Sequence, residues 1–354
     1  MLAVTLKAIA EELGVSRTTV SNAYNRPDQL TPELRERIFA TAERLGYKGP
    51  DAAARTLRTG KRHAVGLLFT EDLQYVFHDP DTTAFLHGVA ETTAQAGLGL
   101  LLLPVPAGMA PHQSAVPSAM VDGVLVYSVP SEHPVLELLG ADIPVVAVDE
   151  PDRPDLAGFV GIDDRAGAFA AAQHLVDLGH REIGIVMGRL GVTPRSGRAD
   201  VGRLAGAEVR VARQRLAGWS AALRDAGIDV DAVPVWETTG NDPDAARVAT
   251  LELLEAHPET TALLCFADQL AIGAVQAAQA LDLRVPDDLS VVGFDDIPRA
   301  TTWDPPLTTV RQPLVDKGRA AAELLLQAIE RDVRRRVDLP VELVVRDSTA
   351  PPRR

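Results

Sequence analysis

Polar side chains suited to reading DNA bases are concentrated in one short segment near the N-terminus. An arginine can donate two parallel hydrogen bonds to guanine O6 and N7, and an asparagine can pair with adenine N6 and N7. Hydroxyl and amide side chains suit contacts with phosphates, which set the register of a protein on DNA rather than its sequence preference. The candidate residues are Ser16, Arg17, Thr18, Thr19, Ser21, Asn22 and Asn25.

Local helix signals place this segment on the second of two short helices. Thr5 is predicted to cap a first helix whose apolar residues recur at the i, i+3, i+4, i+7 spacing, and Gly14 ends that helix because the turn requires a positive φ. Ser16 caps a second helix over residues 17–24, which Pro27 prevents from continuing. Two helices joined in this way form a helix-turn-helix, whose second helix can enter a major groove.

A third helix completes the N-terminal unit. Thr31 followed by Pro32 matches the cap-then-proline start of a helix, and Gly46 closes it. The same residues also fit a small surface hairpin of helices with solvated polar side chains. The motif alone leaves both interpretations open.

Charge is distributed unevenly along the chain. The 354 residues carry a formal net charge of −14. Residues 1–62 hold 11 Lys and Arg against 7 Asp and Glu, a net charge of +4, whereas the remainder holds 24 against 42, a net charge of −18. A small basic head on an acidic body indicates that only the head meets a polyanion.

Composition and motifs exclude several other classes of protein. An apolar fraction of 46% with 24% charged residues is typical of a folded globular chain. The single cysteine, Cys265, excludes an internal disulfide framework and a cysteine-rich metal site. The sequence shows no secretory signal, membrane-spanning run, nucleotide fingerprint or hydrolase motif. We therefore expect a cytoplasmic protein that is not an enzyme and needs no cofactor or metal.

Longer stretches around the helix-turn-helix form a more specific pattern. They are Thr5-Leu-Lys-Ala-Ile-Ala, Gly14-Val-Ser-Arg-Thr-Thr-Val-Ser21, Asn25-Arg-Pro-Asp, Glu43-Arg-Leu-Gly-Tyr47 and Ala53-Ala-Arg-Thr-Leu-Arg-Thr-Gly60. This pattern resembles the lactose-repressor (LacI/GalR) family of bacterial transcription regulators. The sequence departs from the family at Asn22, where Arg is usual, so we expect an altered preference for the base read there.

The resemblance implies a hinge over residues 49–61, in which the seven residues 53–59 become a short helix only on DNA. Leu57 matches a residue that wedges into the minor groove, where an apolar side chain kinks the duplex by about 20–90°. Seven alanine-rich residues are too few for a stable isolated helix, so folding should be coupled to binding. The alternative for Leu57 is packing against the body. The resemblance adds to the predicted DNA contacts Thr5, Lys7, Thr31, Ala54 and Leu57.

Beyond Gly60, apolar strand-like runs alternate with amphipathic helical stretches, which predicts an α/β fold. Several runs are apolar on both faces, as a parallel sheet covered by helices requires. The predicted strands are 64–69, 98–103, 121–126, 144–148, 183–187, 263–266 and 291–294, and the predicted helices are 81–96, 165–178, 214–226, 244–256 and 269–281. We expect two doubly wound α/β subdomains with a ligand at the carboxyl ends of their strands.

The family resemblance continues through the body, for example in Gly161-Ile-Asp-Asp164 and Ala267-Asp-Gln-Leu-Ala-Ile-Gly273. It implies a periplasmic-binding-protein-like core whose chain crosses between subdomains near 158–162, 294–298 and 325–330. The expected domains are a helix-turn-helix over 1–48, the hinge over 49–61, a core over 62–347 and a tail over 348–354. Within the core, the N-subdomain takes 62–160 and 296–327, and the C-subdomain takes 161–295 and 328–347.

A polyol or sugar effector needs acceptors and donors that face each other across the cleft. The positions that match the family's contacts, or lie beside them, are Tyr75, Phe77, Asp149, Arg215, Asn241 and Asp295. The two aromatic residues could stack on a ring, and the arginine can fork onto a carboxylate, a hydroxyl pair or a phosphate. The alternatives are a turn cap for Asp149, a solvated helix position for Arg215 and a backbone amide partner for Asp295.

Two departures weaken the assignment of a sugar. Ala267 stands where sugar-responsive members often have Asn, and Asp268 beside it is predicted to cap the following helix. The arginine-rich segment 189–212 is longer than usual and fits a mobile surface loop better than a ligand-gating lid.

Together these features predict a homodimeric, ligand-responsive transcription factor that acts as a repressor. It would bind a pseudo-palindromic operator in double-stranded DNA and a small-molecule effector such as a sugar, with no membrane partner. The effector can either induce or corepress. The rivals are a solute-binding receptor, against which the missing secretion signal and the attached helix-turn-helix argue, and a doubly wound metabolic enzyme, against which the absent motifs argue.

Overall fold

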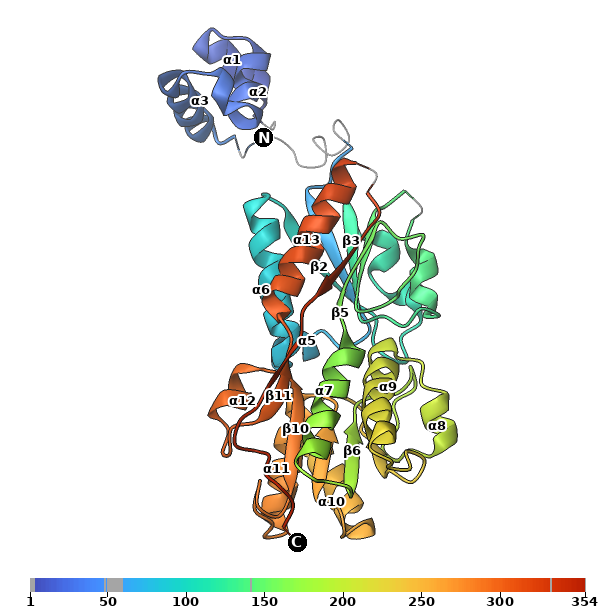
Figure 1. The fold of residues 1–354 in the computed structure, drawn as a ribbon. Helices are drawn as coiled ribbons and strands as arrows, with labels where there is room; N and C mark the ends of the chain where they lie inside the picture. Colours follow the sequence, from blue (N-terminus) through green and yellow to red (C-terminus); the bar gives the residue numbers. More distant parts are fainter. Residues whose placement is uncertain (1–3, 48, 50–59, 141, 332, 354) are drawn as a thin grey trace. The chain divides into compact units, whose positions relative to one another are not determined.

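The computed structural model describes residues 4–47, 49, 60–140, 142–331 and 333–353, and the chain divides into two compact units, residues 1–62 and 63–354. The first unit, the head, consists of α1 (Leu6–Leu13), α2 (Arg17–Asn25), the 3₁₀ turn η1 (Pro27–Gln29) and α3 (Pro32–Leu45) (Figure 1). Its core is formed by Ile9, Ala10, Val20, Ala23, Ile38 and Ala42. The predicted helix-turn-helix is therefore present.

The helices of the head begin at the predicted residues, and α2 ends at Asn25, one residue later than predicted. Ser16 and Thr31 accept capping hydrogen bonds from the backbone N–H groups of Thr19 and Leu34. Gly14 adopts φ +66° after α1, the left-handed conformation that favours glycine. Thr5 occupies the N-cap position of α1, but its side chain makes no capping hydrogen bond.

The second unit, the body, contains two sheets. The first sheet has the order β12-β5-β4-β3-β1-β2, and its strands are parallel. Its strands are β1 (Ala64–Phe69), β2 (Gly99–Pro104), β3 (Gly123–Tyr127), β4 (Val145–Val148), β5 (Gly158–Ile162) and β12 (Arg335–Leu339). We call this sheet and the elements packed on it the first lobe.

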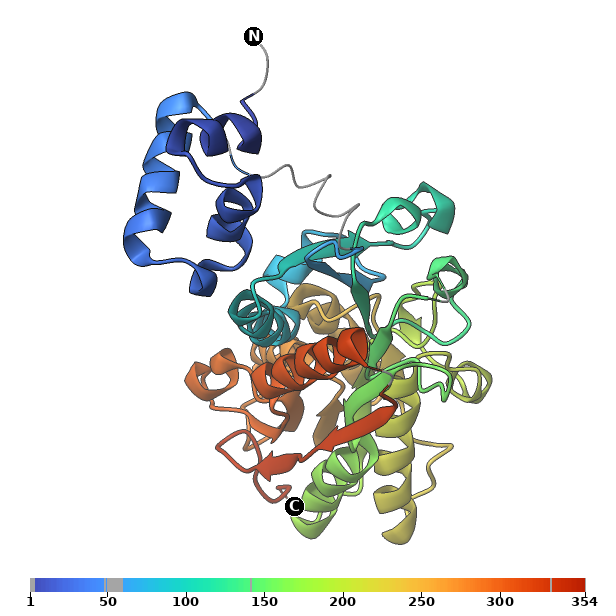
Figure 2. The ribbon, with the colours of Figure 1, turned by 90° about the horizontal axis from the view of Figure 1, so that it is seen from above.

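One face of the first sheet is covered by α6 (Pro80–Gln95) and α13 (Leu314–Glu330), which lie side by side (Figures 1 and 2). The two helices approach closely at glycines: a Cβ on Gly88 would lie 2.0 Å from the carbonyl oxygen of Val315. The opposite face is covered by the 3₁₀ turns η3 (Val116–Ser118) and η4 (Pro134–Leu138). A doubly wound subdomain, as predicted, would have α-helices on this face. Prolines interrupt this stretch of the chain, which prevents long helices there.

The second sheet has the order β13-β11-β10-β9-β6-β8-β7, with β7 and β13 antiparallel to their neighbours. Its strands are β6 (Ile183–Met187), β7 (Gly197–Arg198), β8 (Val235–Glu237), β9 (Ala262–Cys265), β10 (Ser290–Asp295), β11 (Thr308–Arg311) and β13 (Glu342–Val344). Helices α7 (Asp164–Asp177) and α9 (Arg210–Asp225) pack on one face, and α10 (Pro243–Ala256) and α11 (Asp268–Ala280) on the other. This second lobe is doubly wound, as predicted.

The chain passes between the lobes after β5, between β11 and α13, and between β12 and β13. The first crossing follows the predicted range 158–162. The second and third crossings lie later than the predicted ranges 294–298 and 325–330, so β11 belongs to the second lobe and β12 to the first. The edge strand β12 carries exposed charged residues and β11 is rich in threonine, so neither carries the apolar strand signal.

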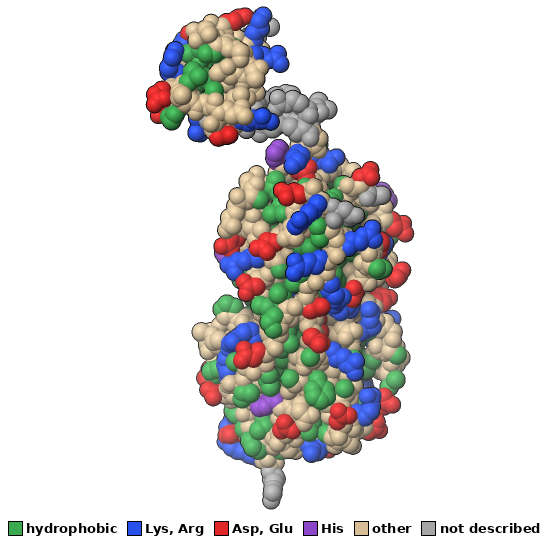
Figure 3. All heavy atoms as spheres, turned by 45° about the horizontal axis from the view of Figure 1, so that its top comes forward, with side chains coloured by type: hydrophobic (Ala, Val, Ile, Leu, Met, Phe, Trp, Pro, Cys, Tyr) green, Lys and Arg blue, Asp and Glu red, His purple; other side chains and the backbone are tan. Residues whose placement is uncertain are grey.

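Acidic and basic side chains are intermixed over the visible face of the body (Figure 3). Within the part of the chain that the structure describes, no helix has the length and apolar character needed to cross a membrane.

Candidate functional site

The first candidate site is the polar surface of α2. Arg17 and Thr18 are exposed, whereas Val20 and Ala23 of the same helix are buried in the core of the head. Asn22 is half-buried, and its amide donates a hydrogen bond to Oε1 of Gln29 at 3.1 Å. Because an amide has two N–H groups and an accepting oxygen, Asn22 keeps the groups needed to pair with adenine.

The other predicted DNA contacts of the head lie at helix ends or on exposed faces. Thr5 and Thr31 are exposed at the N-termini of α1 and α3, and exposed Lys7 lies 3.5 Å from Glu11. Four more predicted DNA contacts lie on α2 or at its start. They are the capping residue Ser16, half-buried Thr19 and Ser21, and the last helical residue Asn25. Ala54 and Leu57 lie outside the described residues.

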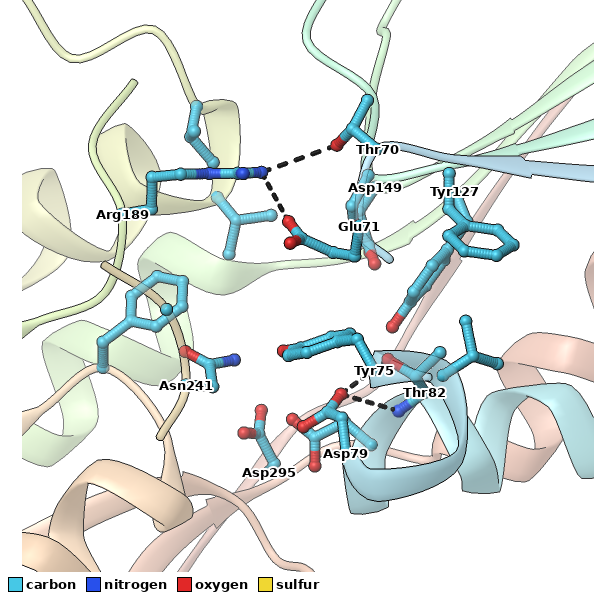
Figure 4. Close-up of a pocket in the computed structure, with 18 of the residues that line it drawn as sticks. Thr70, Glu71, Tyr75, Asp79, Thr82, Tyr127, Asp149, Arg189, Asn241 and Asp295 are labelled. Carbon is cyan, nitrogen blue, oxygen red and sulfur yellow. Dashed lines mark hydrogen bonds and ion pairs between the residues drawn. The ribbon is translucent and has the colours of Figure 1, made fainter. Parts of the chain in front are cut away.

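The second candidate site is a pocket between the two lobes of the body (Figure 4). It is lined by residues at or just after the carboxyl ends of β1, β3 and β4 of the first lobe and of β6, β8, β9 and β10 of the second. The carboxyl ends of parallel strands thus face each other across the pocket, as a topological switch point predicts. The chain passes between the lobes at Gln312 and just before Asp164, and both residues line the pocket.

Arg215, on α9, is fully surrounded by partners in this pocket. Its Nε donates to Oδ1 of Asp164 at 3.0 Å, and Nη2 lies 3.6 Å from Oδ1 of Asp295. Its guanidinium also contacts the carbonyl oxygen of Phe266 and lies over the ring of Phe294. Burial opposes the charge of Arg215, but the two carboxylates outweigh burial and raise its pKa. The protein therefore neutralises this cation itself.

Lys317 connects the two lobes through a chain of hydrogen bonds. This α13 residue is 2% exposed, and its Nζ donates to both carboxylate oxygens of Asp149, at 2.9 and 3.1 Å, and to Oε1 of Gln312. Nε2 of Gln312 donates in turn to Oδ1 of Asp295 at 2.6 Å. Asp149 at the end of β4 is thereby joined to Asp295 at the end of β10.

Two further carboxyl groups enter the pocket from the start of α6. Asp79 caps this helix: its Oδ2 accepts from the backbone N–H and the hydroxyl of Thr82. Burial, opposed by these bonds and assisted by the charge of Asp295, raises the pKa of Asp79 to about 6. Burial also raises the pKa of Asp81 well above its ordinary range, with Asp295 and Asp79 acting in the same direction.

An ion pair also bridges the lobes at the edge of the pocket. Nη2 of Arg189, which follows β6, lies 2.8 Å from Oε1 of Glu71, which follows β1, and 3.5 Å from the hydroxyl of Thr70. Figure 4 shows these contacts at the opposite end of the pocket from Asp79 and Asp295.

The structure brings five of the six predicted effector residues to this pocket: Tyr75, Asp149, Arg215, Asn241 and Asp295. The prediction for Phe77 is wrong, because this residue is 62% exposed and does not line the pocket. Both aromatic residues lie on the one-turn helix α5 (Tyr75–His78), where a spacing of two residues turns side chains about 200° apart. The alternative of a solvated Arg215 is also wrong.

Asp268 does not cap the following helix as predicted. It is the first residue of α11 and is buried, and its carboxylate accepts from the backbone N–H of Ile297 at 2.9 Å and the hydroxyl of Thr309 at 2.5 Å. Its role is to join α11 to the segments around β10 and β11.

The arginine-rich segment 189–212 has regular structure, including β7 and the short helix α8 (Val201–Ala205). Arg203 forms a two-point ion pair with buried Glu237, whose Oε1 also accepts the backbone N–H of Leu190. The segment ends on the pocket wall at Val209 and Val211. It is therefore anchored to β8 and forms part of the pocket.

Sequence reasoning missed Asp79, Asp81, Asp164 and Lys317. Asp79-Pro80 has the same cap-then-proline form as Thr31-Pro32 and could have marked a helix start. A single lysine among the apolar residues of α13 was the other available signal, because a buried lysine requires a carboxylate partner.

The pocket offers carboxylates, amides and aromatic rings for binding rather than an activated nucleophile. Cys265 is buried in β9 and burial raises the pKa of its thiol. Among the described residues, no cluster of His, Cys, Asp and Glu has the arrangement of a metal site.

Comparisons with known proteins agree with both parts of this architecture. The family described as bacterial regulatory proteins, lacI family, matches residues 5–49, and a periplasmic binding protein-like domain matches residues 172–349. The HTH-type transcriptional regulator Rv3575c of Mycobacterium tuberculosis is 46% identical over 328 residues, covering 91% of this chain and 90% of that protein.

Solved structures of similar fold cover nearly the whole chain. The lac repressor dimer bound to operator and the anti-inducer ONPF has a TM-score of 0.79 at 26% identity, over 99% of this chain and 100% of that one. The complex of the transcriptional regulator CelR with cellobiose has a TM-score of 0.71 at 29% identity, over 98% and 99% of the two chains.

A helix-turn-helix head joined to a two-lobed body with an interlobe pocket defines a DNA-binding transcriptional regulator that responds to a small molecule. The chain belongs to the lacI family of bacterial regulatory proteins. Members of this family are transcriptional regulators rather than enzymes.

Proposed function

We propose that the protein is a repressor whose affinity for operator DNA is set by a metabolite bound between the two lobes of its body. The observation that carries this proposal is the pocket itself, because residues of both lobes line it and a ligand there can bind one arrangement of the lobes better than another. A ligand shifts a conformational equilibrium only through such a difference in affinity.

In the head, α2 enters the major groove. Arg17 and Asn22 contact base edges, and the predicted hydroxyl and amide residues hold phosphates. The segment 49–61 acts as the hinge, with Leu57 as the wedge in the minor groove and Ala54 as a further DNA contact. The domain boundaries predicted from the sequence for the head and the hinge belong to this proposal.

In the body, Asp149, Arg215, Asn241 and Asp295 form the polar contacts of the effector, and Tyr75 stacks on it. The cellobiose bound by CelR supports a sugar or related metabolite as the ligand class. By linkage, operator DNA and effector must change each other's affinity by the same factor.

Two copies of the chain bind one pseudo-palindromic operator, because two-fold protein symmetry matches two equivalent half-sites. The lac repressor, which has been crystallised as a dimer on its operator, supports this arrangement. We place the protein in the cytoplasm, where the operator is accessible.

The test is a selection of genomic DNA fragments by the purified full-length protein, with and without low-molecular-mass metabolites extracted from cells. We expect a small set of related, pseudo-palindromic fragments whose binding weakens with salt and changes with the metabolites. Equal binding of genomic and random duplex under both conditions would contradict the proposal.

A further inference from the structure

Helix α9, which carries Arg215, begins without a capping side chain of its own. Its N-cap residue is Val209, whose side chain makes no capping hydrogen bond, and its first turn contains Arg210 and Arg213 but no acidic residue. The first N–H groups of a helix lack partners within the helix, and positive charge beside them is unfavourable. The start of α9 therefore depends on an acceptor from elsewhere.

The acceptor comes from the other lobe. Oε2 of Glu150, two residues after β4 in the first lobe, accepts the backbone N–H of Arg210 at 3.0 Å. Nη1 of Arg210 donates to the carbonyl oxygen of Asp149 at 3.2 Å, and its guanidinium lies over the ring of Phe159 on β5. The first turn of α9 is thus held against the first lobe. We call the contact between Glu150 and the N–H of Arg210 the interlobe cap.

The interlobe cap lies beside the effector pocket. Asp149, the neighbour of Glu150 in the chain, lines the pocket from the first lobe, and Arg215, five residues after Arg210 on α9, lines it from the second. A movement of one lobe against the other would break the cap and change the separation of these two pocket residues. The cap therefore belongs to the lobe arrangement that assembles the pocket.

Glu150 is buried and has an acceptor atom to spare. It is 1% exposed, and its Oε1 accepts no hydrogen bond from any residue that the structure describes. Burial raises the pKa of Glu150 from 4.5 to about 7, opposed by the bond from Arg210 and the charge of Arg213 and assisted by the charge of Asp149. With a proton on Oε1, the carboxyl group still accepts the N–H of Arg210 through Oε2, so the cap persists without charge.

The other charged groups around the cap have partners of their own. Asp152, in the loop after β4, lies 3.9 Å from Nε of Arg210 and accepts from Nη1 of Arg336 on β12 at 2.8 Å. Oε2 of Glu208, two residues before α9, accepts the backbone N–H of Val192 at 2.7 Å. Both acidic side chains are exposed and screened by water, so the capping carboxyl is the group whose environment changes when the lobes separate.

We propose that Glu150 is a positioning residue that caps α9 across the boundary between the lobes, and that forming this cap takes up a proton from solvent. The lobe arrangement that brings Arg215 to the pocket is therefore favoured at low pH. The contribution of the proton is present in full below pH 4.5 and is lost as the pH rises through 7, which makes the arrangement about 10-fold less favourable at pH 8 than at pH 6. This inference rests on the proposed function, since it adds control by pH to the effector response.

The first test follows the cap by hydrogen exchange of residues 209–213 in the unliganded full-length protein, corrected for the pH dependence of chemical exchange. In the wild type, we expect the protection of this turn to fall about 10-fold between pH 6 and 8. Glu150→Gln keeps an accepting oxygen but cannot ionise, so its protection should be the same at both pH values. Glu150→Leu has no acceptor, so its protection should be low at both.

The matched control for this test is Asp242→Asn. Asp242 caps α10 through the backbone N–H of Ala245, and both residues belong to the second lobe. The protection of residues 209–213 in this variant should follow the wild type at both pH values, because its cap does not cross the lobe boundary.

The second test measures the effector response. The affinity of the wild type and of Glu150→Gln for a selected genomic fragment is measured at pH 6 and pH 8 as an extract of cell metabolites is added. Raising the pH should increase the amount of extract needed for half of the response by up to about 10-fold more in the wild type than in Glu150→Gln. The pKa of Asp79 in the pocket is also raised, to about 6, but Asp79 is present in both proteins, so the difference between them reports Glu150.

The two levels of the account fail in different ways. Equal pH dependence of protection in the wild type and Glu150→Gln, or equal shifts in the amount of extract, overturns the inference and leaves the proposed function standing. Operator affinity that no extract changes at either pH contradicts the proposed function, and the exchange measurement then still decides whether the cap takes up a proton.

Discussion

The head and the pocket use polar residues in opposite ways. On α2, Arg17 and Thr18 are exposed to water, whereas in the pocket Arg215, Lys317 and Asp295 are 4%, 2% and 2% exposed and are held by internal partners. A surface that meets a large polyanion can remain hydrated until contact. A pocket that recognises a small molecule must place its polar groups beforehand, because the molecule is too small to order them.

The largest expected effect tests the buried charges of the pocket. Lys317→Met should lower the free energy of unfolding of the body by about 3–5 kcal/mol, because it leaves the carboxylate of Asp149 buried without its cation. The measurement is urea unfolding followed by tryptophan fluorescence, since Trp219, Trp236 and Trp303 all lie in the body.

Two further variants sharpen this test. Arg284→Met breaks exposed ion pairs that water screens, so it should change the stability far less than Lys317→Met does. Adding Asp149→Asn to Lys317→Met should restore part of the loss, because the uncompensated charge is then absent. Equal losses for Lys317→Met and Arg284→Met would remove the distinction between buried and exposed charges.

The pH dependence of stability tests a second buried carboxyl group. Burial raises the pKa of Glu150 from 4.5 to about 7, against the opposing bond from the backbone N–H of Arg210 and the charge of Arg213, with Asp149 acting in the same direction as burial. Since the folded state holds this proton more tightly, its contribution is present below pH 4.5 and is lost as the pH rises through 7, by about 3 kcal/mol. The stability of Glu150→Gln should therefore fall less between pH 5 and 8 than that of the wild type, and parallel pH profiles would contradict this explanation.

DNA binding tests the exposed surface of the head. Arg17→Ala and Asn22→Ala should each change the preference for one base, at a cost of about 1–3 kcal/mol per lost contact. The measurement is the affinity of the wild type and of each variant for a set of operators that differ at single base pairs. If both variants keep the wild-type order of preference, α2 does not read those bases.

The smallest expected effect distinguishes two helix starts within the head. Ser16→Ala should lower the local stability of α2 by about 1 kcal/mol, because it removes the hydrogen bond that the backbone N–H of Thr19 donates to Oγ of Ser16. Thr5→Ala should have little effect on α1, since Thr5 makes no capping bond. Hydrogen exchange of residues 6–45 without DNA measures the local stability of α1 and α2 in both variants. Equal losses of stability in the two helices would contradict the difference in capping.

How far the sequence predicted the structure also differs between the two regions. In the head, each signal concerns residues a few positions apart, and the helix limits at Gly14, Ser16, Thr31 and Gly46 are confirmed. The seven strands predicted for the body lie within two residues of observed strands, for example β1 and β6, but β5 and β8 were not predicted as strands. Local patterns are sufficient wherever the contacts that fix an element are local.

The pocket required information that local patterns lack. Lys317 meets Asp149 from a position 168 residues away, and Asp79 meets Asp295 only because the lobes face each other. The later crossings at β11 and β12 were predicted too early because neither strand is apolar throughout. The family resemblance identified Asp149, Arg215 and Asp295 as pocket residues. The residues of opposite charge that pair with them can be identified only from the three-dimensional structure.

The most direct test of the central claim, that a ligand in the body controls DNA binding by the head, is the operator affinity of the wild type and of Asp295→Asn. It is measured by fluorescence anisotropy on a selected genomic fragment as cell metabolites are added. We predict that both proteins bind the fragment equally without metabolites and that only the wild type changes its affinity when they are added. An equal response from Asp295→Asn would contradict the account.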